Sequence, residues 1–361
     1  MQDVANVRAN NRLSFSEVMP NLQIAWDSVS LGALKKCPRY YQYAIVEGWT
    51  SKHGTKLDLR FGQLYHRALE VYDHHSFEGA SHDDALKAAL KDLADGCQDW
   101  KLVEGEVPEG ARVTEPDPVT GERYYRVGWW DPNEGLHEKK ASANTKTIFT
   151  LFRTVVWYLD QFGQADTLRT IRLANGKPAV ELSFRYEFGY TFETGEEMLH
   201  SGHLDRVVQM GEEGPKYVLD RKTTKNTIDG NSAWGYFAKY SPDNQMTGYT
   251  LAAKVVLGFN TEGVIIDAAQ IAKGFSRFER GITTRTEAQL EEWRSDVMYW
   301  VRQAELFAKA NYWPMNDRSC DEYGGCPFRG ICSKDPAVRH VYLQSDFTKR
   351  LWDPLQTRGD I

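Results

Sequence analysis

The chain has 361 residues, with 44 Lys and Arg against 50 Asp and Glu, and its formal net charge is −6. Hydrophobic residues make up 41% and charged residues 26%, a balance that excludes collagen-like, coiled-coil and wholly disordered chains. The acidic excess argues against a general nucleic-acid coat protein, but it does not exclude a local basic groove, because net charge describes the whole surface rather than one site.

No segment of the sequence is typical of a targeting signal or a membrane span. The N-terminal residues lack the apolar core of a signal peptide. The most apolar stretches, 147–159 and 249–259, are interrupted by Arg153 and Lys254 and are too short to cross a bilayer. We therefore expect a cytoplasmic protein without membrane contacts, whose five cysteines stay reduced instead of forming disulfides.

The first half of the chain has mostly helical spacing of its apolar residues. A helix is expected over 28–47, with a kink or junction at Pro38, because proline has no backbone N–H to donate. Residues 103–146 are rich in Gly, Pro and charge, which predicts an insertion or flap with a hairpin in its middle. The other helices in this half are expected over 57–75, 82–94 and 147–163.

The second half of the chain begins with strand periodicity. From Val180 to Phe192 apolar and polar residues alternate, which is typical of a half-buried strand. Two further strands are expected at 198–210 and 216–223, joined by a turn. The remaining predicted elements are a helix over 245–257 capped by Asp243 or Asn244, a strand over 263–271, a helix over 286–310 and a loop-rich tail from 311. This order predicts an α+β fold.

Two carboxylates and one lysine lie near the ends of neighbouring predicted strands. Asp220 and Lys222 are two residues apart, so they project from the same face of a strand, while Arg221 points away. If the strands form a hairpin, Asp205 approaches Asp220. Carboxylates bind Mg²⁺ or Mn²⁺, and the lysine could orient or deprotonate a nucleophile or neutralise charge in a transition state. A D-x-K pattern by itself is equally consistent with a surface ion pair.

Four short motifs with fixed internal spacing follow one another along the chain. They are G-x-x-x-H at Gly62–His66, G-x-x-D-R at Gly202–Arg206, D-x-K-T at Asp220–Thr223 and Q-x-x-x-Y at Gln245–Tyr249. In this order they resemble the RecB-like branch of the PD-(D/E)XK nuclease superfamily. The resemblance implies a restriction-endonuclease-like core with a mixed sheet flanked by helices, formed here by residues 180–271.

The resemblance also implies a metal site for Mg²⁺ or Mn²⁺. Its ligands would be His66, Asp205 and Asp220, and the backbone carbonyl of Arg221 would complete it. Glu181 matches a glutamate that often precedes the first motif strand in this branch. It is expected either near the metal or on the polar side of an edge strand.

The same resemblance assigns catalytic roles. Lys222 would be the catalytic lysine, acting with the metal-binding Asp205 and Asp220. Gln245 and Tyr249, one helical turn apart, would hold the DNA strand or support Lys222.

Four of the five cysteines form a pattern. Cys320, Cys326 and Cys332 are each separated by five intervening residues in a Gly- and Pro-containing loop, and Cys37 precedes the nuclease motifs. Four thiolates suit a 4Fe–4S cluster or a structural zinc. Cys97 fits no pattern and is expected to be an ordinary thiol.

The placement of these cysteines is similar to that in iron–sulfur nucleases of the RecB-like branch, such as the AddB nuclease domain and the CRISPR-associated spacer-acquisition nucleases. In those proteins one cysteine before the core and three after it bind a 4Fe–4S cluster. The resemblance implies that segments 28–56 and 311–361 meet at such a cluster, so that residues 1–361 form one domain. The first spacing after Cys320 is longer than the usual two residues, which keeps zinc as an alternative.

These expectations add up to a metal-dependent DNA exonuclease that acts on single-stranded DNA or DNA ends, in recombination, repair or phage DNA processing. The alternatives are a non-catalytic nucleic-acid-binding scaffold with a nuclease fold and a zinc-stapled endonuclease. The sequence has no G-x-x-x-x-G-K-[ST] motif, so the chain is expected to be either a stand-alone nuclease or the nuclease partner of a separate helicase or recombinase. A DNA channel is predicted to be lined by Arg206, Arg221, Lys225, Lys239, Trp234, Tyr236 and Phe237.

Overall fold

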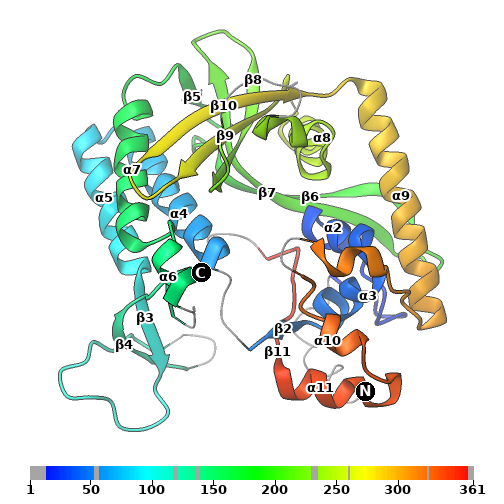
Figure 1. Ribbon diagram of the computed structural model, residues 1–361. Helices are drawn as coiled ribbons and strands as arrows, with labels where there is room; N and C mark the ends of the chain where they lie inside the picture. The colour runs from blue at the N-terminus through cyan, green and yellow to red at the C-terminus, as the bar shows by residue number, and fades with distance from the viewer. Residues whose placement is uncertain are drawn as a thin grey trace.

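The computed structural model describes residues 14–52, 57–116, 121–134, 138–228, 235–258, 261–322 and 325–356. Within them the chain forms a mixed β-sheet flanked by helices, which confirms the predicted α+β fold (Figure 1). Trp234 and parts of the predicted segments 28–56, 103–146 and 311–361 lie outside the described residues.

The helix predicted over 28–47 is divided at the proline. Its first part is α2 (Ser28–Lys36), and the chain then becomes extended at Cys37. Pro38 begins α3 (Pro38–Tyr41), which continues into the π-helical turn η1 (Gln42–Val46). The predicted junction is therefore present, and Cys37 lies in it instead of inside a continuous helix.

The other predicted helices are present with slightly different ends. The side chain of Asp243 accepts a hydrogen bond from the Met246 N–H and so caps the helix that follows it. These helices are α4 (Leu57–Phe77), α5 (His82–Gly96), α7 (Ile148–Phe162), α8 (Asn244–Leu257) and α9 (Glu287–Ala310). Among the described residues, no helix combines the length and the apolar character needed to cross a membrane.

The main sheet has the strand order β1-β7-β8-β9-β10, and β5 and β6 also pair with β7. β6, β7 and β8 are antiparallel, as predicted, whereas β8 and β9 run parallel. The seven strands are β1 (Ala25–Trp26), β5 (Leu168–Thr170), β6 (Val180–Thr191), β7 (Glu197–Met210), β8 (Lys216–Thr224), β9 (Gly263–Ile271) and β10 (Ser276–Thr284).

Sequence analysis did not predict β1, β5 or β10. The first two have only two and three residues, too few for a periodic pattern. In β10 only Phe278, Gly281 and Thr283 are buried, and they do not alternate regularly with polar residues. The long antiparallel pairing with the fully buried β9 holds β10 in the sheet, which is a tertiary effect.

The two faces of the sheet are covered by different helices. On one face, α4, α5 and α7 pack against Ala269, Ile271 and Phe278. On the other face, α8 packs against the alternate residues of the same strand, Val264 and Ile266. A third core, around Trp26, Trp293 and the outer end of β6, joins α2 and α9 to the sheet.

The strand β7 changes its neighbour along one edge near its middle. Its first half pairs in parallel with β1, through Leu199 and His200. Its second half pairs with β8, beginning at Arg206, which is opposite Leu219. The part of β8 from Asp220 to Thr224 pairs with β9. The β7–β8 ladder therefore ends beside Asp205 and Asp220, and the two strands diverge from there.

The predicted insertion contains a small separate sheet. Its strands are β3 (Gln98–Leu102) and β4 (Tyr124–Trp129), which lie at the lower left in Figure 1. The hairpin was expected in the middle of residues 103–146. Instead, β4 pairs with β3, which lies just before residue 103. A short helix, α6 (Glu138–Ala143), follows the two strands.

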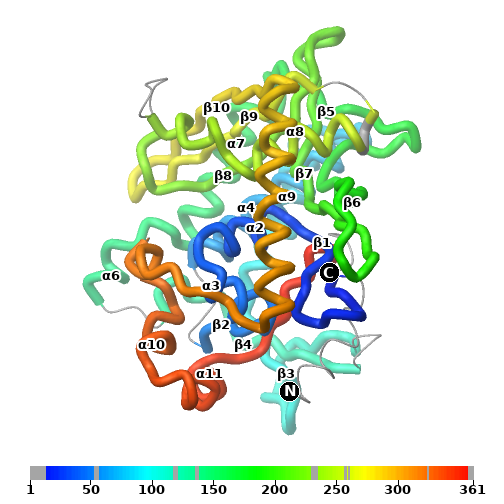
Figure 2. Tube along the Cα trace, turned by 90° about the vertical axis from the view of Figure 1, so that its right-hand side faces the viewer, coloured from blue at the N-terminus to red at the C-terminus, as the bar shows by residue number. Residues whose placement is uncertain are grey.

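The N-terminal and C-terminal segments lie side by side. β2 (Trp49–Ser51) pairs with β11 (Phe347–Lys349), and both views show the two segments in contact (Figures 1 and 2). Phe328, Leu343 and Phe347 pack with Tyr43 in a small core at this place. The remaining C-terminal elements are η3 (Asp317–Cys320), α10 (Arg329–Cys332), η5 (Pro336–Val338) and α11 (Arg339–Asp346).

Candidate active site

Two aspartates lie at the point where β7 and β8 diverge. Asp205 and Asp220 are only 4% and 1% exposed. The backbone N–H of Arg221 donates a hydrogen bond of 2.8 Å to Oδ2 of Asp205, across the gap between the strands. This bond holds the Asp205 carboxylate beside Asp220 without closing the gap, so the sheet geometry itself brings the two carboxylates together.

A chain of hydrogen bonds leads from Asp220 to α8. The Lys222 ammonium lies 2.8 Å from Oδ2 of Asp220 and donates a bond of 3.0 Å to Oε1 of Gln245. The Gln245 amide in turn donates to the Tyr249 hydroxyl at 2.8 Å. The two helical residues therefore support Lys222, one of the two roles that the resemblance implies for them.

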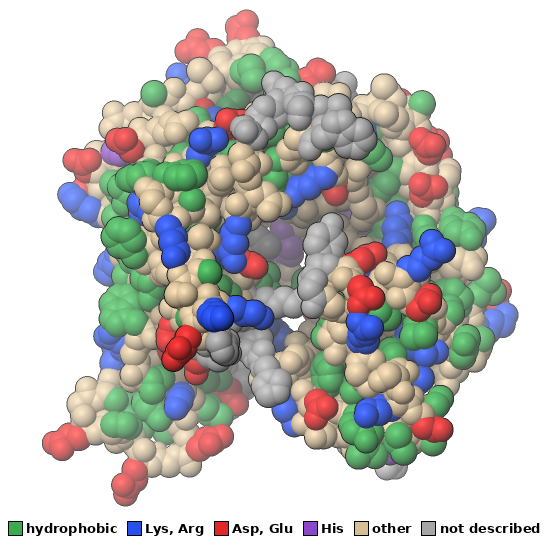
Figure 3. Space-filling model, in the orientation of Figure 1, with side chains coloured by type: hydrophobic (Ala, Val, Ile, Leu, Met, Phe, Trp, Pro, Cys, Tyr) green, Lys and Arg blue, Asp and Glu red, His purple; other side chains and the backbone are tan. Residues whose placement is uncertain are grey.

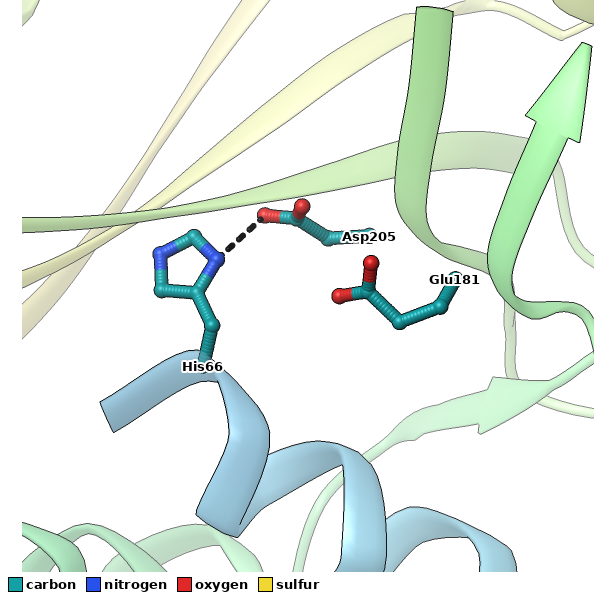
Figure 4. A group of neighbouring side chains, drawn as sticks. All are labelled: His66, Glu181 and Asp205. Atoms are coloured by element: carbon teal, nitrogen blue, oxygen red, sulfur yellow. Dashed lines mark ion pairs between the residues drawn. The ribbon is translucent and has the colours of Figure 1, made fainter. Parts of the chain in front are cut away.

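The third element of the site is α4, which carries His66. Nδ1 of His66 lies 3.4 Å from Oδ2 of Asp205, and Glu181 of β6 points toward both (Figure 4). One donor atom from each of these three residues lies within 4.8 Å of the others. The structure thus brings His66, Glu181 and Asp205 together from three separate elements, and Asp220 and Lys222 adjoin them through Asp205.

Glu181 has an unusual backbone conformation. Its φ is +48°, in the left-handed region that residues with a side chain rarely adopt, although its neighbours continue the strand. Such a conformation costs about 1–3 kcal/mol and persists where the surroundings hold it in place. The strained residue is also the one that contributes a second carboxylate to the group around His66.

The charges at this site shift one another's protonation. Burial opposes ionisation of Asp205, but the charges of His66 and Lys222 and the Arg221 N–H hold its pKa below the usual value. Burial, with the nearby charge of Asp205, raises the pKa of Asp220 despite the Lys222 ammonium. Burial also disfavours the charged form of Lys222, yet the two aspartates outweigh it and raise the pKa of Lys222. Shifted pKa values produced by burial and by specific charged neighbours are typical of a functional site.

The donor set fits a divalent cation. An imidazole nitrogen and two carboxylates lie within 4.8 Å of one another. Ligands of one Mg²⁺ ion are at most about 4.2 Å apart, because each Mg²⁺–oxygen distance is about 2.0–2.1 Å, so small side-chain movements would bring all three onto one ion. Carboxylates suit Mg²⁺ and Mn²⁺ alike, while an imidazole ligand is more usual for transition metals. Asp220 and the Arg221 carbonyl adjoin this group at the end of the β7–β8 ladder.

Part of the predicted DNA channel is wrong. Arg206 and Arg221 face the opposite side of the sheet, where both contact Asp73 of α4, and the Arg221 side chain is only 1% exposed. Lys239 does lie among aromatic residues, with Nζ 4.0 Å from the Tyr236 ring centroid. Lys225 follows the end of β8 and contacts Asp58. A hollow opens between the two halves of the molecule, with Lys and Arg at its rim and a histidine deep inside (Figure 3).

Asp73 was not selected from the sequence. A carboxylate two helical turns after His66 does not by itself form a recognisable motif. Its arginine partners come from strands more than a hundred residues away. The only available signal was spacing, since His66 and Asp73 lie on the same face of one helix.

The four patterned cysteines line one small cavity. Cys37, Cys320, Cys326 and Cys332 surround it together with Tyr40 and Phe328. The Asn316 N–H donates to the Cys37 sulfur at 3.3 Å. Burial raises the pKa of the Cys326 and Cys332 thiols, and the neighbouring thiols add to the effect. The cavity is thus formed by both ends of the chain.

The donor set around this cavity fits a soft metal centre. Four thiols can supply four thiolates, and cationic side chains nearby would stabilise their negative charge. These cationic residues are Lys36, Arg39, Arg329 and Arg339. Among the described cysteines, no three sulfur atoms lie within 4.8 Å of one another. Cys97 lies in the separate core around α4, α5 and α7 and takes no part.

Comparison with known protein families gives a match over most of the chain. A family model described as the PD-(D/E)XK nuclease superfamily matches residues 29–333. No curated protein sequence matches the chain. A crystal structure from Eubacterium rectale, described provisionally as an exonuclease, is similar at 12% identity and a TM-score of 0.41, covering 84% of this chain and 88% of that one. The crystal structure of SSO0001 is similar at 12% identity and a TM-score of 0.24, covering 45% and 63% of the two chains.

Proposed function

Because the chain belongs to the PD-(D/E)XK nuclease superfamily, we propose that it is a metal-dependent deoxyribonuclease of the RecB-like branch. The observation that supports this most strongly is the meeting of four sequence motifs at one place. His66, Asp205, Lys222 and Gln245 come from α4, β7, β8 and α8 and lie around the diverging ends of two strands. A scaffold without catalytic activity would not need these residues to converge.

The cation would be held by His66, Asp205, Asp220 and Glu181, with the carbonyl of Arg221 available to complete its coordination. When bound, a divalent cation supplies Lewis acidity to the phosphodiester and to the attacking water. The protein's own part is to hold the ligands in place and to keep water away from the buried faces of Asp205 and Asp220.

Lys222 is proposed to act as a charged group. The carboxylates of Asp220 and Asp205 raise its pKa, so it carries a proton at neutral pH. A fixed ammonium beside the scissile phosphate stabilises the charge that develops in the transition state. Of the lysine roles expected from the sequence, neutralisation of charge therefore agrees best with its surroundings. Gln245 and Tyr249 would fix its direction.

The proposed substrate is single-stranded DNA or a DNA end, and the proposed reaction is exonucleolytic. A hollow with a cationic rim suits the phosphate backbone (Figure 3). Lys239 is exposed beside the rings of Tyr236 and Tyr240 and provides a positive charge for the phosphate backbone, while the two tyrosines themselves are buried. A role in recombination, repair or phage DNA processing, with a separate helicase or recombinase, follows from the resemblance to the RecB-like branch.

The four cysteines are proposed to bind a 4Fe–4S cluster that joins the ends of the chain. The four thiols line one cavity formed by both ends of the chain, and four cysteine thiolates are the usual ligand set of a 4Fe–4S cluster. When bound, the cluster would link the four cysteines to one another. It would take no part in hydrolysis.

The experiment that tests the proposed function is degradation of end-labelled single-stranded DNA with Mn²⁺. We expect mononucleotides or short products from one end, no cleavage with EDTA, and no cleavage by the Asp220→Ala variant. A circular single strand distinguishes the modes of attack, since an exonuclease leaves it intact. Cleavage by Asp220→Ala at the parent rate would refute the assigned site, and inactivity of the parent on all DNA substrates would favour the scaffold.

Glu181 leads to a prediction about stability. Glu181→Asn is expected to stabilise the metal-free protein by about 1 kcal/mol, because Asn adopts the left-handed conformation more readily and the substitution removes a carboxylate near Asp205. The same change should weaken Mn²⁺ binding. Chemical denaturation and Mn²⁺ titration measure the two effects. The matched control is Glu187→Asn, at an exposed position of the same strand, which should not gain stability. A Glu181→Asn protein less stable than the parent would contradict the strain argument.

A further inference from the structure

One carboxylate on α4 contacts both strands of the active site. Oδ2 of Asp73 accepts a hydrogen bond of 2.6 Å from Nη2 of Arg221, and Oδ1 lies 3.4 Å from Nη1 of Arg206. The side chains of Asp73, Arg206 and Arg221 are 6%, 12% and 1% exposed. We call these three residues the Asp73 clip.

Each arginine of the clip directly follows an active-site aspartate. Arg206 follows Asp205 on β7, and Arg221 follows Asp220 on β8. Because alternate residues of a strand point to opposite faces, each aspartate faces the metal site while its arginine faces the other side of the sheet. A shift of either arginine along its strand would therefore move the neighbouring carboxylate.

The clip connects the same three elements that form the metal site. Asp73 lies two helical turns after His66, on the same side of α4. α4 thus contacts β7 twice, through His66 at Asp205 and through Asp73 at Arg206. The β7–β8 ladder has ended at this point, so the separation of the two strands depends on side-chain contacts: the Arg221 N–H bond to Asp205 on one side and the clip on the other.

We propose that Asp73 is a positioning residue of the metal site: by holding Arg206 and Arg221 together, it sets the separation of Asp205 and Asp220 and their distance from His66. This inference rests on the proposed metal-dependent function. It concerns a residue that contacts the two arginines on the other face of the strands and is not itself one of the proposed metal ligands.

A purely structural role is the competing explanation, since removing one partner of a buried ion pair leaves the other charge uncompensated and destabilises the fold. The chain offers a matched control. Asp166 makes two hydrogen bonds of 2.8 Å with Arg280 on the same face of the sheet, and its side chain is 11% exposed. Arg280 lies on β10 and is not adjacent in sequence to any proposed metal ligand.

The test compares Mn²⁺ binding by the full-length parent, Asp73→Asn and Asp166→Asn, measured from the signal of free Mn²⁺ in electron paramagnetic resonance. Asp73→Asn should weaken binding by about tenfold or more, as loss of a residue that orients metal ligands does elsewhere. Asp166→Asn should lower the melting temperature but bind Mn²⁺ like the parent. Equal binding by Asp73→Asn and the parent, or equal weakening by both variants, would overturn the proposal.

Two further measurements keep the test decisive. The Arg221 amide, which donates to Asp205, should exchange its hydrogen faster in Asp73→Asn than in Asp166→Asn. If Asp73→Asn does not fold, Arg206→Gln removes the longer contact of the clip together with the Arg206 hydrogen bond to Thr170 and leaves the Asp73–Arg221 bond in place, and parent-like Mn²⁺ binding by this variant would overturn the proposal. Asp205→Asn separates the two hypotheses: if the parent binds no Mn²⁺, or Asp205→Asn binds it equally well, the proposed metal site itself is wrong.

Discussion

Replacing Lys222 with methionine is expected to lower the turnover rate of DNA hydrolysis by about 10²- to 10³-fold, the usual effect of removing one preorganised charge or donor from a transition state. The ammonium lies 2.8 Å from Asp220 and donates to Gln245, so it is held in one place before substrate binds. Methionine keeps most of the side-chain volume but carries no charge. Single-turnover hydrolysis of end-labelled DNA measures the change.

The folded state should survive this substitution. Without the ammonium, the pKa of Asp220, which burial and Asp205 already raise, would rise further, so Asp220 can take up a proton instead of remaining a buried, unpaired charge. Circular dichroism and the melting temperature of Lys222→Met check this point. A variant that is folded and hydrolyses DNA at the parent rate would contradict the proposed role of Lys222.

Two control variants distinguish how Lys222 acts. Lys222→Arg keeps the positive charge, so it should retain more activity than Lys222→Met if the charge stabilises the transition state. If the lysine instead removes a proton from the attacking water, both variants should be equally inactive, because arginine stays protonated. Tyr249→Phe removes only the hydroxyl that accepts from Gln245 and should lower the rate by less than about tenfold.

The sequence predicted the elements and the local chemistry well, because both depend on short-range patterns. Strict alternation located β6, and helical spacing located α4 and α8 within about three residues at their ends. The motif residues could be selected because each lies at a fixed spacing inside one element. These residues meet where β7 and β8 separate. Their meeting depends on how the strands pair, and no local sequence pattern encodes that pairing.

The residues that sequence analysis misplaced depend on long-range contacts. Arg206 and Arg221 were expected in a DNA channel because arginines near a nuclease motif commonly contact phosphate. In the folded chain strand alternation turns both away from Asp205 and Asp220, and Asp73 neutralises them. For Arg221 the alternation was already visible in the sequence. Its partner was not, since Asp73 and Arg221 are separated by 148 positions.

The second prediction with a large expected effect concerns the cysteines that join the two ends of the chain. Cys326→Ser is expected to abolish the visible absorption of protein purified without oxygen and to lower the melting temperature by on the order of 10 °C. Without the centre, the ends would be held by weaker contacts: the short β2–β11 pairing, the core around Phe328, and the hydrogen bonds of Asn316 and Ser319 to the Lys36 carbonyl. Differential scanning calorimetry and metal analysis measure the outcome.

Cys97 provides the matched control for this effect. It is equally a cysteine and is fully buried, but it lies in the core between α4 and α5, and burial raises the pKa of its thiol to about 11, which favours an inert protonated group. Cys97→Ala should keep the absorption and the bound metal and should cost only about 1 kcal/mol of unfolding free energy. If the parent protein is colourless and contains one zinc per chain, the four cysteines bind a structural zinc instead of an iron–sulfur cluster. If Cys326→Ser kept the metal content and melting temperature of the parent, the four cysteines would not form a common site, and the ends would be joined by packing alone.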